Sequence, residues 1–252
     1  MILQEIKPYA IAIVVLLTIV EVYYSIKSNK KLYDAQDTWT SILLGLFGFI
    51  TRFFTKALNL AIWYWFYSFS LFKIESSVWS FLVLFVLHEF IYYWYHRFSH
   101  ESRFMWATHV NHHSSTKFNL SVAARTPFLN FGYLIIFWIP LVLIGFNPID
   151  VLIVQMVSLY LSFIQHTTLI PKLGFLEKFL STPSHHRVHH ASNPQYINKN
   201  YGSVLIIFDK IFGTFTPEEA TPIYGITKNP KNRSTLNMIF HGWISYFKKE
   251  EF

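Results

Sequence analysis

The chain has 252 residues, of which 52% are hydrophobic, 19% aromatic and 14% charged. Because a soluble domain carries about 25% charged residues, this composition excludes a disordered or fibrous chain and is typical of a protein embedded in lipid. The net charge of +7 comes from basic residues between long apolar runs, which favours positive loops beside a membrane over binding to nucleic acid. The sequence lacks cysteine, which excludes disulfides, iron–sulfur clusters and thiolate zinc sites, and leaves twelve histidines as the main soft metal ligands.

Five apolar segments follow in chain order, each near the length of about 20 residues that a helix needs to cross a bilayer. They cover residues 9–24, 41–72, 77–95, 127–145 and 149–169. The second contains Arg52 and Lys56, so the sequence leaves open one long tilted helix or a broken pair. The sequence therefore predicts an all-α integral membrane protein, one domain over residues 1–252, with four to five transmembrane helices.

Loop charge predicts the orientation of these segments. Three lysines follow the first segment (Lys27, Lys30 and Lys31), and basic residues concentrate in loops on the cytoplasmic side. Counting crossings from that loop places His96 and His166, at the ends of the third and fifth segments, at the same cytoplasmic face. Residues 96–126 and 171–252 are then expected to form a cytoplasmic helical cap on a multi-pass membrane protein.

The histidines are strongly clustered. Six of the twelve lie between residues 88 and 113, four more lie in the run His185-His186-Arg187-Val188-His189-His190, and the first 87 residues contain none. His96 and His100 are one helical turn apart. Each of two triplets, His109/His112/His113 and His186/His189/His190, has the i, i+3, i+4 spacing that brings side chains to one side of a helix.

Neutral imidazole suits iron, copper, zinc or nickel, whereas calcium prefers oxygen ligands. The eight histidines of the pair and the two triplets exceed the roughly six ligands that one ion accepts, so the spacing predicts two metal ions. His166, at the same membrane face, is a ninth candidate ligand. His88 lies about 80° around the helix from His96 and is expected to pack or to support a ligand. For His185 the sequence leaves two roles open, a metal ligand or a residue that orients its neighbours. His241 is expected to make an interfacial polar contact.

Three carboxylates are candidates for orienting the imidazoles. Glu89 lies within about 20° of the helix face of His96 and at membrane depth, where an acidic side chain is usually functional. We expect it to accept the distal N–H of a ligand imidazole and so to fix its tautomer. Glu101, next to His100, and Asp209 are weaker candidates for the same task, and for Glu101 the alternative is a solvated interfacial acid.

Three stretches of the sequence resemble the histidine boxes of the fatty acid hydroxylase/sterol desaturase superfamily. They are Tyr92-Tyr93-Trp94-Tyr95-His96-Arg97 with His100, then Trp106 with His109, His112, His113 and Ser114, and finally Thr182-Pro183-Ser184-His185-His186-Arg187-Val188-His189-His190. Within the superfamily, Asn119-Leu120-Ser121, Asn198-Lys199-Asn200-Tyr201-Gly202 and Asp209-Lys210-Ile211-Phe212-Gly213-Thr214 resemble the alkylglycerol monooxygenase branch. The likeness covers roughly residues 21–217.

The resemblance implies an integral membrane enzyme with a di-iron centre that uses O2 to hydroxylate or desaturate a C–H bond of a lipid. The substrate would be an alkylglycerol-type ether lipid, a fatty acyl chain or a sterol. The nine histidines would then be the iron ligands. Glu101 matches an acidic position beside the second histidine of the branch and becomes, with Glu89, a candidate catalytic residue.

Electrons for such a reaction must come from outside the chain, because the sequence contains neither a GxGxxG dinucleotide fingerprint nor a CxxCH haem motif. A reduced pterin such as tetrahydrobiopterin, a ferredoxin or a cytochrome b5-like protein is therefore expected as the donor. The alternative function is a histidine-rich membrane metal transporter or storage protein. Transporters place their ligands near the bilayer midplane, whereas these boxes fall at one membrane face, which favours the enzyme.

Overall fold

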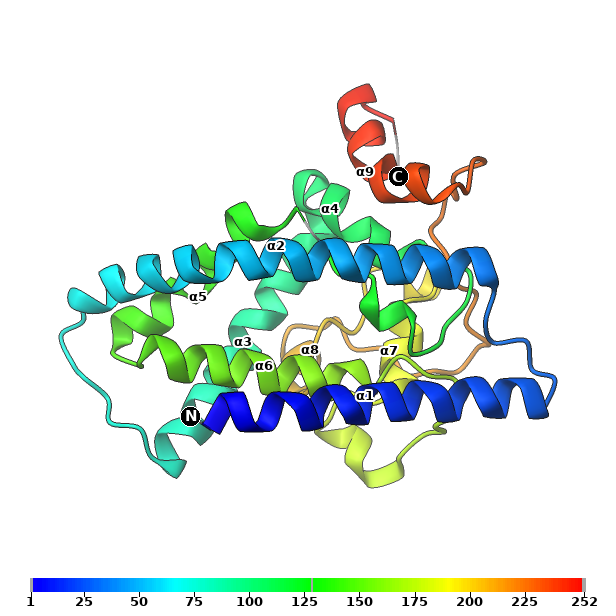
Figure 1. Cartoon of the computed structure of the whole chain (residues 1–252). Coiled ribbons are helices and arrows are strands. Elements are labelled where there is room, and N and C mark those ends of the chain that lie inside the picture. The colour runs from blue at the N-terminus through cyan, green and yellow to red at the C-terminus, as the bar shows by residue number, and fades with distance from the viewer. Residues whose placement is uncertain (1, 128, 251–252) are drawn as a thin grey trace.

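The computed structural model describes residues 2–127 and 129–250, and nine α-helices and three short 3-10 helices occur in them (Figure 1). In chain order these are α1 (Ile2–Lys27), α2 (Ala35–Ser68), α3 (Val78–Glu101), α4 (Arg103–His113), η1 (Val122–Ala124), α5 (Phe131–Ile144), α6 (Pro148–Phe163), η2 (Gly174–Lys178), α7 (Pro183–His189), η3 (Pro194–Tyr196), α8 (Ile207–Ile211) and α9 (Thr235–Lys248). Within the described residues, β-type pairing is confined to two isolated bridges. The all-α prediction is confirmed.

The second apolar segment forms a single helix, α2, and not a broken pair. Asp34 caps its N-terminus by accepting a hydrogen bond from the backbone N–H of Asp37, and 34 residues follow without interruption. Arg52 and Lys56 do not break the helix, because both are good helix formers and both side chains are exposed. At 1.5 Å per residue α2 is about 51 Å long and exceeds a hydrocarbon core of about 30 Å.

The third segment extends further than predicted. A Ser77–Ser80 capping box starts α3, and no Gly or Pro interrupts it before it ends at Glu101, six residues beyond the predicted end at Tyr95. His96 and His100 therefore lie on the last turns of α3, which continues into the residues predicted to form the cap. Where the cap begins stays a prediction. Ser102 separates α3 from α4 and caps α4 through its side chain.

α2 and α3 are long and apolar enough to cross a membrane. α5 and α6 are apolar but have 14 and 16 residues, about 21 and 24 Å, so they are shorter than the predicted segments 127–145 and 149–169. α6 ends at Phe163 because the chain then turns inward, where Gln165 and His166 are buried. The first segment is longer than expected, since α1 runs from Ile2 to Lys27. The number of complete crossings stays a prediction.

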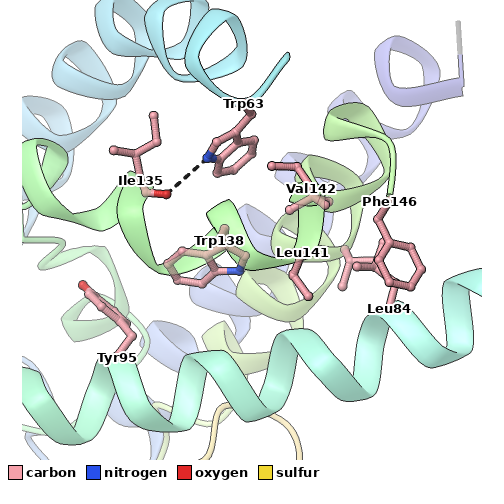
Figure 2. Close-up of a cluster of buried hydrophobic side chains, with 10 residues drawn as sticks. Trp63, Leu84, Tyr95, Ile135, Trp138, Leu141, Val142 and Phe146 are labelled. Carbon is pink, nitrogen blue, oxygen red and sulfur yellow. Dashed lines mark hydrogen bonds between the residues drawn. The ribbon is translucent and has the colours of Figure 1, made fainter. Parts of the chain in front are cut away.

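A buried apolar cluster joins α2, α3, α5 and α6 (Figure 2). Trp63 of α2 donates its indole N–H to the backbone carbonyl of Ile135 in α5 at 3.2 Å, and Trp138 packs between this contact and Tyr95 of α3. The cluster removes large apolar surface from the surroundings and satisfies the indole N–H of Trp63, whereas the buried indole N–H of Trp138 has no hydrogen-bond partner. It fixes the direction of α3, and with it the position of the histidines at its end.

Candidate metal centre

The nine predicted histidines meet in the interior as two groups. The first group contains His96, His100, His109, His113 and His189, and the second contains His112, His166, His186 and His190. Within each group, one ring nitrogen from every member lies within 4.8 Å of those of the other members. Two groups of five and four donors match the two metal ions that the sequence predicts.

Four elements deliver these rings. α3 supplies His96 and His100, α4 supplies the triplet that ends at His113, α7 and its C-terminal cap supply the triplet that ends at His190, and His166 follows α6. Each triplet is divided between the groups: the residues at i and i+4 join one group, and the residue at i+3 joins the other. The division follows from helix geometry, because i and i+4 differ by about 40° whereas i+3 points 60–100° away from both.

The spacing of the ring nitrogens fits a shared cation. Nε2 of His109 lies 3.1 Å from Nε2 of His96 and 3.2 Å from Nε2 of His113, and Nε2 of His186 lies 2.9 Å from that of His166 and 3.1 Å from that of His190. Two imidazole nitrogens at about 2.1 Å from one ion and at right angles to each other are about 3.0 Å apart. The observed distances therefore suit cis ligands of a single ion.

The tautomers support the same interpretation most directly at His112 and His166. Each ring donates its Nδ1–H to a backbone carbonyl, that of Arg125 and that of Ser162 respectively, because a carbonyl only accepts. A neutral ring has one N–H, so both Nε2 atoms carry lone pairs, yet these atoms face each other at 3.3 Å. Two lone pairs repel at this distance unless a cation lies between them.

Several buried ring nitrogens have no hydrogen-bond partner. Within the two groups they are Nε2 of His100 and His189 and Nδ1 of His109 and His186; Nδ1 of His88 and Nε2 of His241 lie outside the groups. A buried acceptor without a partner destabilises the fold by about 1–3 kcal/mol, and a metal ion bound at Nε2 of His100 and His189 would satisfy those two atoms. Imidazole-only donor sets suit borderline transition metals such as iron, and the residues present therefore fit the two ions.

Burial also keeps these imidazoles neutral. It lowers the pKa of His109, His112, His113, His186, His189 and His190 well below the ordinary histidine value, and the neighbouring imidazoles add to this effect. Burial lowers the pKa of His166 to about 4. Because the neutral ring is the form that binds a metal, these side chains are available as ligands near neutral pH.

The predicted role of Glu89 is wrong. Its carboxylate accepts hydrogen bonds from the Ser158 hydroxyl and from the backbone N–H groups of Val204 and Leu205, and its nearest imidazole is His88 at 3.4 Å. None of these partners belongs to the two histidine groups. Glu89 shares a helix face with His96, but seven residues separate them by about 10 Å along the axis, which is too far for contact.

Backbone carbonyls take the place of the expected carboxylates. His96 donates from Nδ1 to the carbonyl of Tyr201 at 2.7 Å, and His189 donates from Nδ1 to that of Lys199 at 2.9 Å. Residues 199–205, here called the orienting loop, therefore fix two members of the first group. Such hydrogen bonds set the ring tautomer and raise the basicity of the ligand.

Asp209 holds the orienting loop in place. Its carboxylate accepts from the backbone N–H groups of Tyr201 and Gly202 and from the Thr214 hydroxyl, each at 2.7 Å. Gly202 is required here, because a Cβ at this position would lie 2.3 Å from the carbonyl oxygen of Leu205. Asp209, the weaker candidate, thus orients the candidate ligand His96 indirectly, because it holds the Tyr201 carbonyl that accepts the Nδ1–H of His96.

A buried ion pair, not anticipated from the sequence, supports the second group. The guanidinium of Arg125 lies 2.7 Å from the Asp37 carboxylate and donates to the hydroxyls of Ser41 and Ser114, and its own carbonyl orients His112. Arg125 has no exposed surface. One indication of this pair was present in the sequence, because Arg125 stands beside an apolar segment. A charged side chain that is buried in such a place needs a partner of opposite charge.

The three remaining histidines and Glu101 lie outside the two groups. His185 contacts the carbonyl of Leu180, His88 stacks with Tyr92, and His241 is buried in α9, so none joins the groups. Glu101 has a side chain 40% exposed and pairs with Arg97 at 2.8 Å. Its position matches the solvated acid considered in the sequence analysis.

A cavity of about 300 Å³ opens onto the first group. His100, His113, His189 and His190 form its inner wall, and Glu101 and Trp106 are among the residues that line the rest. The first group is therefore reachable by a small molecule without movement of α3 or α4.

The chain belongs to the fatty acid hydroxylase family. The family's sequence model ("Fatty acid hydroxylase") matches residues 81–214, which contain all nine histidines of the two groups. The predicted family resemblance is thereby confirmed. Together with α2 and α3, which are long enough to span a bilayer, this membership defines a membrane protein with a histidine-rich interior site.

Named relatives agree with this assignment. The chain is 38% identical over 245 residues to alkylglycerol monooxygenase of Homo sapiens, covering 96% of this chain and 54% of that protein. It is 45% identical over 152 residues to alkylglycerol monooxygenase of Danio rerio (60% of this chain, 34% of that protein) and 33% identical over 146 residues to ornithine lipid hydroxylase OlsE of Rhizobium tropici (56% and 44%). The chain thus spans about half the length of the human relative, and no solved structure matches it.

Proposed function

We propose that this protein is a membrane-bound, O2-dependent di-iron enzyme that hydroxylates or desaturates a C–H bond of a lipid. The observation that carries this proposal is the convergence of nine neutral imidazoles into groups of five and four inside the region shared with the family. The relatives are named for oxidation of alkylglycerols and ornithine lipids, so an ether lipid, a fatty acyl chain or a sterol is the proposed substrate class.

The iron ions would be held by the first group, His96, His100, His109, His113 and His189, and by the second, His112, His166, His186 and His190. Bound iron would supply O2 activation and the oxidising power for the C–H bond. The protein itself orients the rings through backbone carbonyls and keeps water out by burying them. Because their pKa values are depressed, the rings do not need to lose a proton to bind metal near neutral pH.

We propose that the cavity over the first group receives the reductant. Its volume of about 300 Å³ is at the small end of the range of ligand pockets, which favours a small donor such as reduced tetrahydrobiopterin. Glu101, in its wall, is then placed to contact that donor, and a catalytic role for Glu101 remains part of the proposal. A ferredoxin or a cytochrome b5-like protein would instead dock over the mouth.

The site is proposed to lie at the cytoplasmic face. The lysine-rich loop after α1 packs beside the second histidine box, since Lys117 donates to the carbonyl of Lys31 and Asn119 to that of Leu32. The loop predicted to be cytoplasmic and the metal centre are therefore on the same side of the molecule. This arrangement supports the orientation derived from loop charge.

Metal analysis and lipid oxidation test the proposal together. The purified full chain in nanodiscs is expected to bind two irons and, with O2 and a reductant, to oxidise a lipid that mass spectrometry identifies. His189→Ala should lower iron binding at the first group and His112→Ala at the second, and either change should abolish activity. His241→Gln, a buried histidine outside both groups, is the matched control and should retain iron and activity.

Two results would count against the enzyme. Full activity in either alanine variant would contradict the assignment of that histidine as an iron ligand. Stoichiometric metal binding without O2-dependent lipid oxidation under any of the three classes of donor would favour the alternative of metal storage or transport.

A further inference from the structure

We propose that α9 is a membrane-surface helix whose outer face is embedded at the boundary between lipid headgroups and acyl chains. The inference concerns how the cap meets the bilayer and does not depend on the proposed reaction. Figure 1 shows α9 on the outside of the molecule, beside α4. With 14 residues and a length of about 21 Å, it is too short to cross a bilayer.

α9 has a buried inner face and an exposed, apolar outer face. Met238, Ile239, His241 and Gly242 are buried on the inner face, where the helix packs so closely on α4 that a Cβ on Gly242 would lie 2.3 Å from the carbonyl oxygen of Ala107. Leu236, Ile244 and Phe247 lie about 180° away around the helix and are 71%, 40% and 75% exposed. Packing against α4 therefore accounts for the inner face, and the exposed apolar side chains of the outer face need another partner.

The position of α9 relative to α2 places that outer face near the membrane surface. Thr235 contacts Thr40 at 3.1 Å between the hydroxyl oxygens, and Gln36 donates to the carbonyl of Arg233 at 2.7 Å. These contacts join the start of α9 to the first turns of α2. Since α2 is about 51 Å long, its end turns extend past a core of about 30 Å into the headgroup region.

An aromatic path connects α9 with the apolar helix α5. The ring of Trp243 lies 5.4 Å from that of Phe104, and Phe104 lies 5.9 Å from Tyr133 near the start of α5. Tyr246 packs on the same Phe104 ring at 6.0 Å. Trp and Tyr are enriched where the bilayer meets water, because their rings are apolar and their tips are polar. The outer face of α9 is therefore continuous with surface that belongs in lipid.

The basic residues on either side of α9 indicate that its outer face contacts lipid and not another apolar protein surface. Residues 226–250 contain five basic side chains, Lys228, Lys231, Arg233, Lys248 and Lys249, and one acid, Glu250. Glu250 lies 4.0 Å from Lys248, and Arg233 lies 3.3 Å from Asp37, so the segment keeps a net positive charge. An amphipathic helix flanked by Lys and Arg binds the interface through its apolar face and anionic headgroups through its charges. The proposed partner is therefore a bilayer that contains anionic phospholipid.

Single cysteines can test this directly, because the chain has none. We would label Leu236→Cys and Phe247→Cys with a fluorophore, in the full chain in nanodiscs with or without anionic phosphatidylglycerol. Quenching by a nitroxide-labelled phosphatidylcholine reports contact with lipid, and quenching by iodide reports contact with water. Phe54→Cys, exposed near the middle of α2, is the lipid control, and the exposed Glu219→Cys is the water control.

We expect both α9 labels to be quenched by the nitroxide lipid about as strongly as the Phe54 label, and by iodide at least about threefold less than the Glu219 label. Adding Lys248→Gln and Lys249→Gln should reduce the lipid quenching in anionic nanodiscs and leave it unchanged in neutral ones. Iodide quenching equal to that of the Glu219 label would overturn the proposal. Protection from both quenchers, with cross-linking between Phe247→Cys chains, would identify a second copy as the partner and also overturn it.

Discussion

Four ring N–H groups that donate to backbone carbonyls decide which nitrogen their histidines present to the candidate metal site. They belong to His96, His112, His166 and His189. At the scale of single residues, the buried charges act one step away from these rings, since they fix the backbone that carries the carbonyls. Substitutions of such residues should therefore change metal affinity without removing a ligand.

Asp209→Asn tests this indirect control of the first group. The amide can accept one of the two backbone N–H bonds but presents an NH2 group to the other, so the Tyr201 carbonyl should lose its position against His96. We expect iron affinity to fall by about 10–100-fold at the first group, as for other residues that support metal ligands. Competition with a coloured chelator measures the affinity, and Glu219→Gln, at an exposed acid, is the control.

Glu89→Gln should separate structural support from metal binding. The carboxylate is buried and accepts three hydrogen bonds, and hydrogen bonds to charged groups contribute about 1.5–3 kcal/mol each. We expect a lower thermal midpoint in the metal-free protein, with two irons still bound at saturating iron and a lower iron affinity only at the first group, through the orienting loop. Loss of a single iron at unchanged stability would instead restore the role that the sequence suggested for Glu89.

Arg125→Met examines the support of the second group. Removing one partner of a buried ion pair destabilises a protein by about 3–5 kcal/mol, because the other charge stays buried. Asp37 retains Arg233 at 3.3 Å, so the effect should be at the lower end of this range. Thermal unfolding measures the loss, and iron binding should weaken more at the second group, where the Arg125 carbonyl contacts His112, than at the first.

At the scale of elements, α3 and α4 hold their histidines in fixed positions, whereas the orienting loop is the part of the site that a substitution can displace. α3 is fixed by the apolar cluster around Trp138, whereas the loop depends on Glu89, Asp209 and one close approach at Gly202. Disturbing the loop should therefore affect the first group while the helices keep their positions.

Gly202→Ala makes this disturbance with a single methyl group. The added Cβ would lie 2.3 Å from the Leu205 carbonyl oxygen, and relieving such overpacking usually lowers stability by about 1–3 kcal/mol. We expect reduced iron binding at the first group together with a lower melting temperature. Gly132→Ala is the matched control, since a Cβ there meets nothing within 4 Å, and it should melt at or above the temperature of the unsubstituted protein.

At the scale of the whole molecule, the buried histidines make metal-free stability depend on pH. Their folded pKa values lie below the ordinary value of about 6.5, so the unfolded chain binds more protons as the pH falls through that value. Stability is therefore present above about pH 6.5 and is lost below it, by up to about 1.4 kcal/mol per histidine for each pH unit.

Unfolding of the chelator-treated protein in detergent, followed between pH 8 and pH 5, measures this effect. The iron-loaded protein should remain stable further into the acid range and then lose iron, because protons and metal compete for the same nitrogens. A melting temperature that is constant over the whole range would contradict the depressed pKa values.

Much of the centre was predictable because helical spacing is a local property. The pattern of His96 and His100 and of the two triplets indicated shared faces, and the count of donors indicated two ions before any tertiary contact was known. The three histidine boxes also indicated the family from the sequence alone, and the match of the family model over residues 81–214 confirms that prediction. Helix ends were less predictable, since α3 continues past Tyr95, α5 begins only at Phe131, and α6 ends at Phe163, where the chain turns inward.

The sequence by itself determined the all-helical class, the family and the identity of the nine histidines, since each follows from composition or from spacing within about ten residues. Only the tertiary structure decided how each triplet divides between the two groups, and that backbone carbonyls and not Glu89 orient the rings. Those features depend on contacts such as that of His96 with Tyr201, which are 105 residues apart. Local sequence periodicity cannot predict such a contact, because only the packing of the folded chain brings the two residues together.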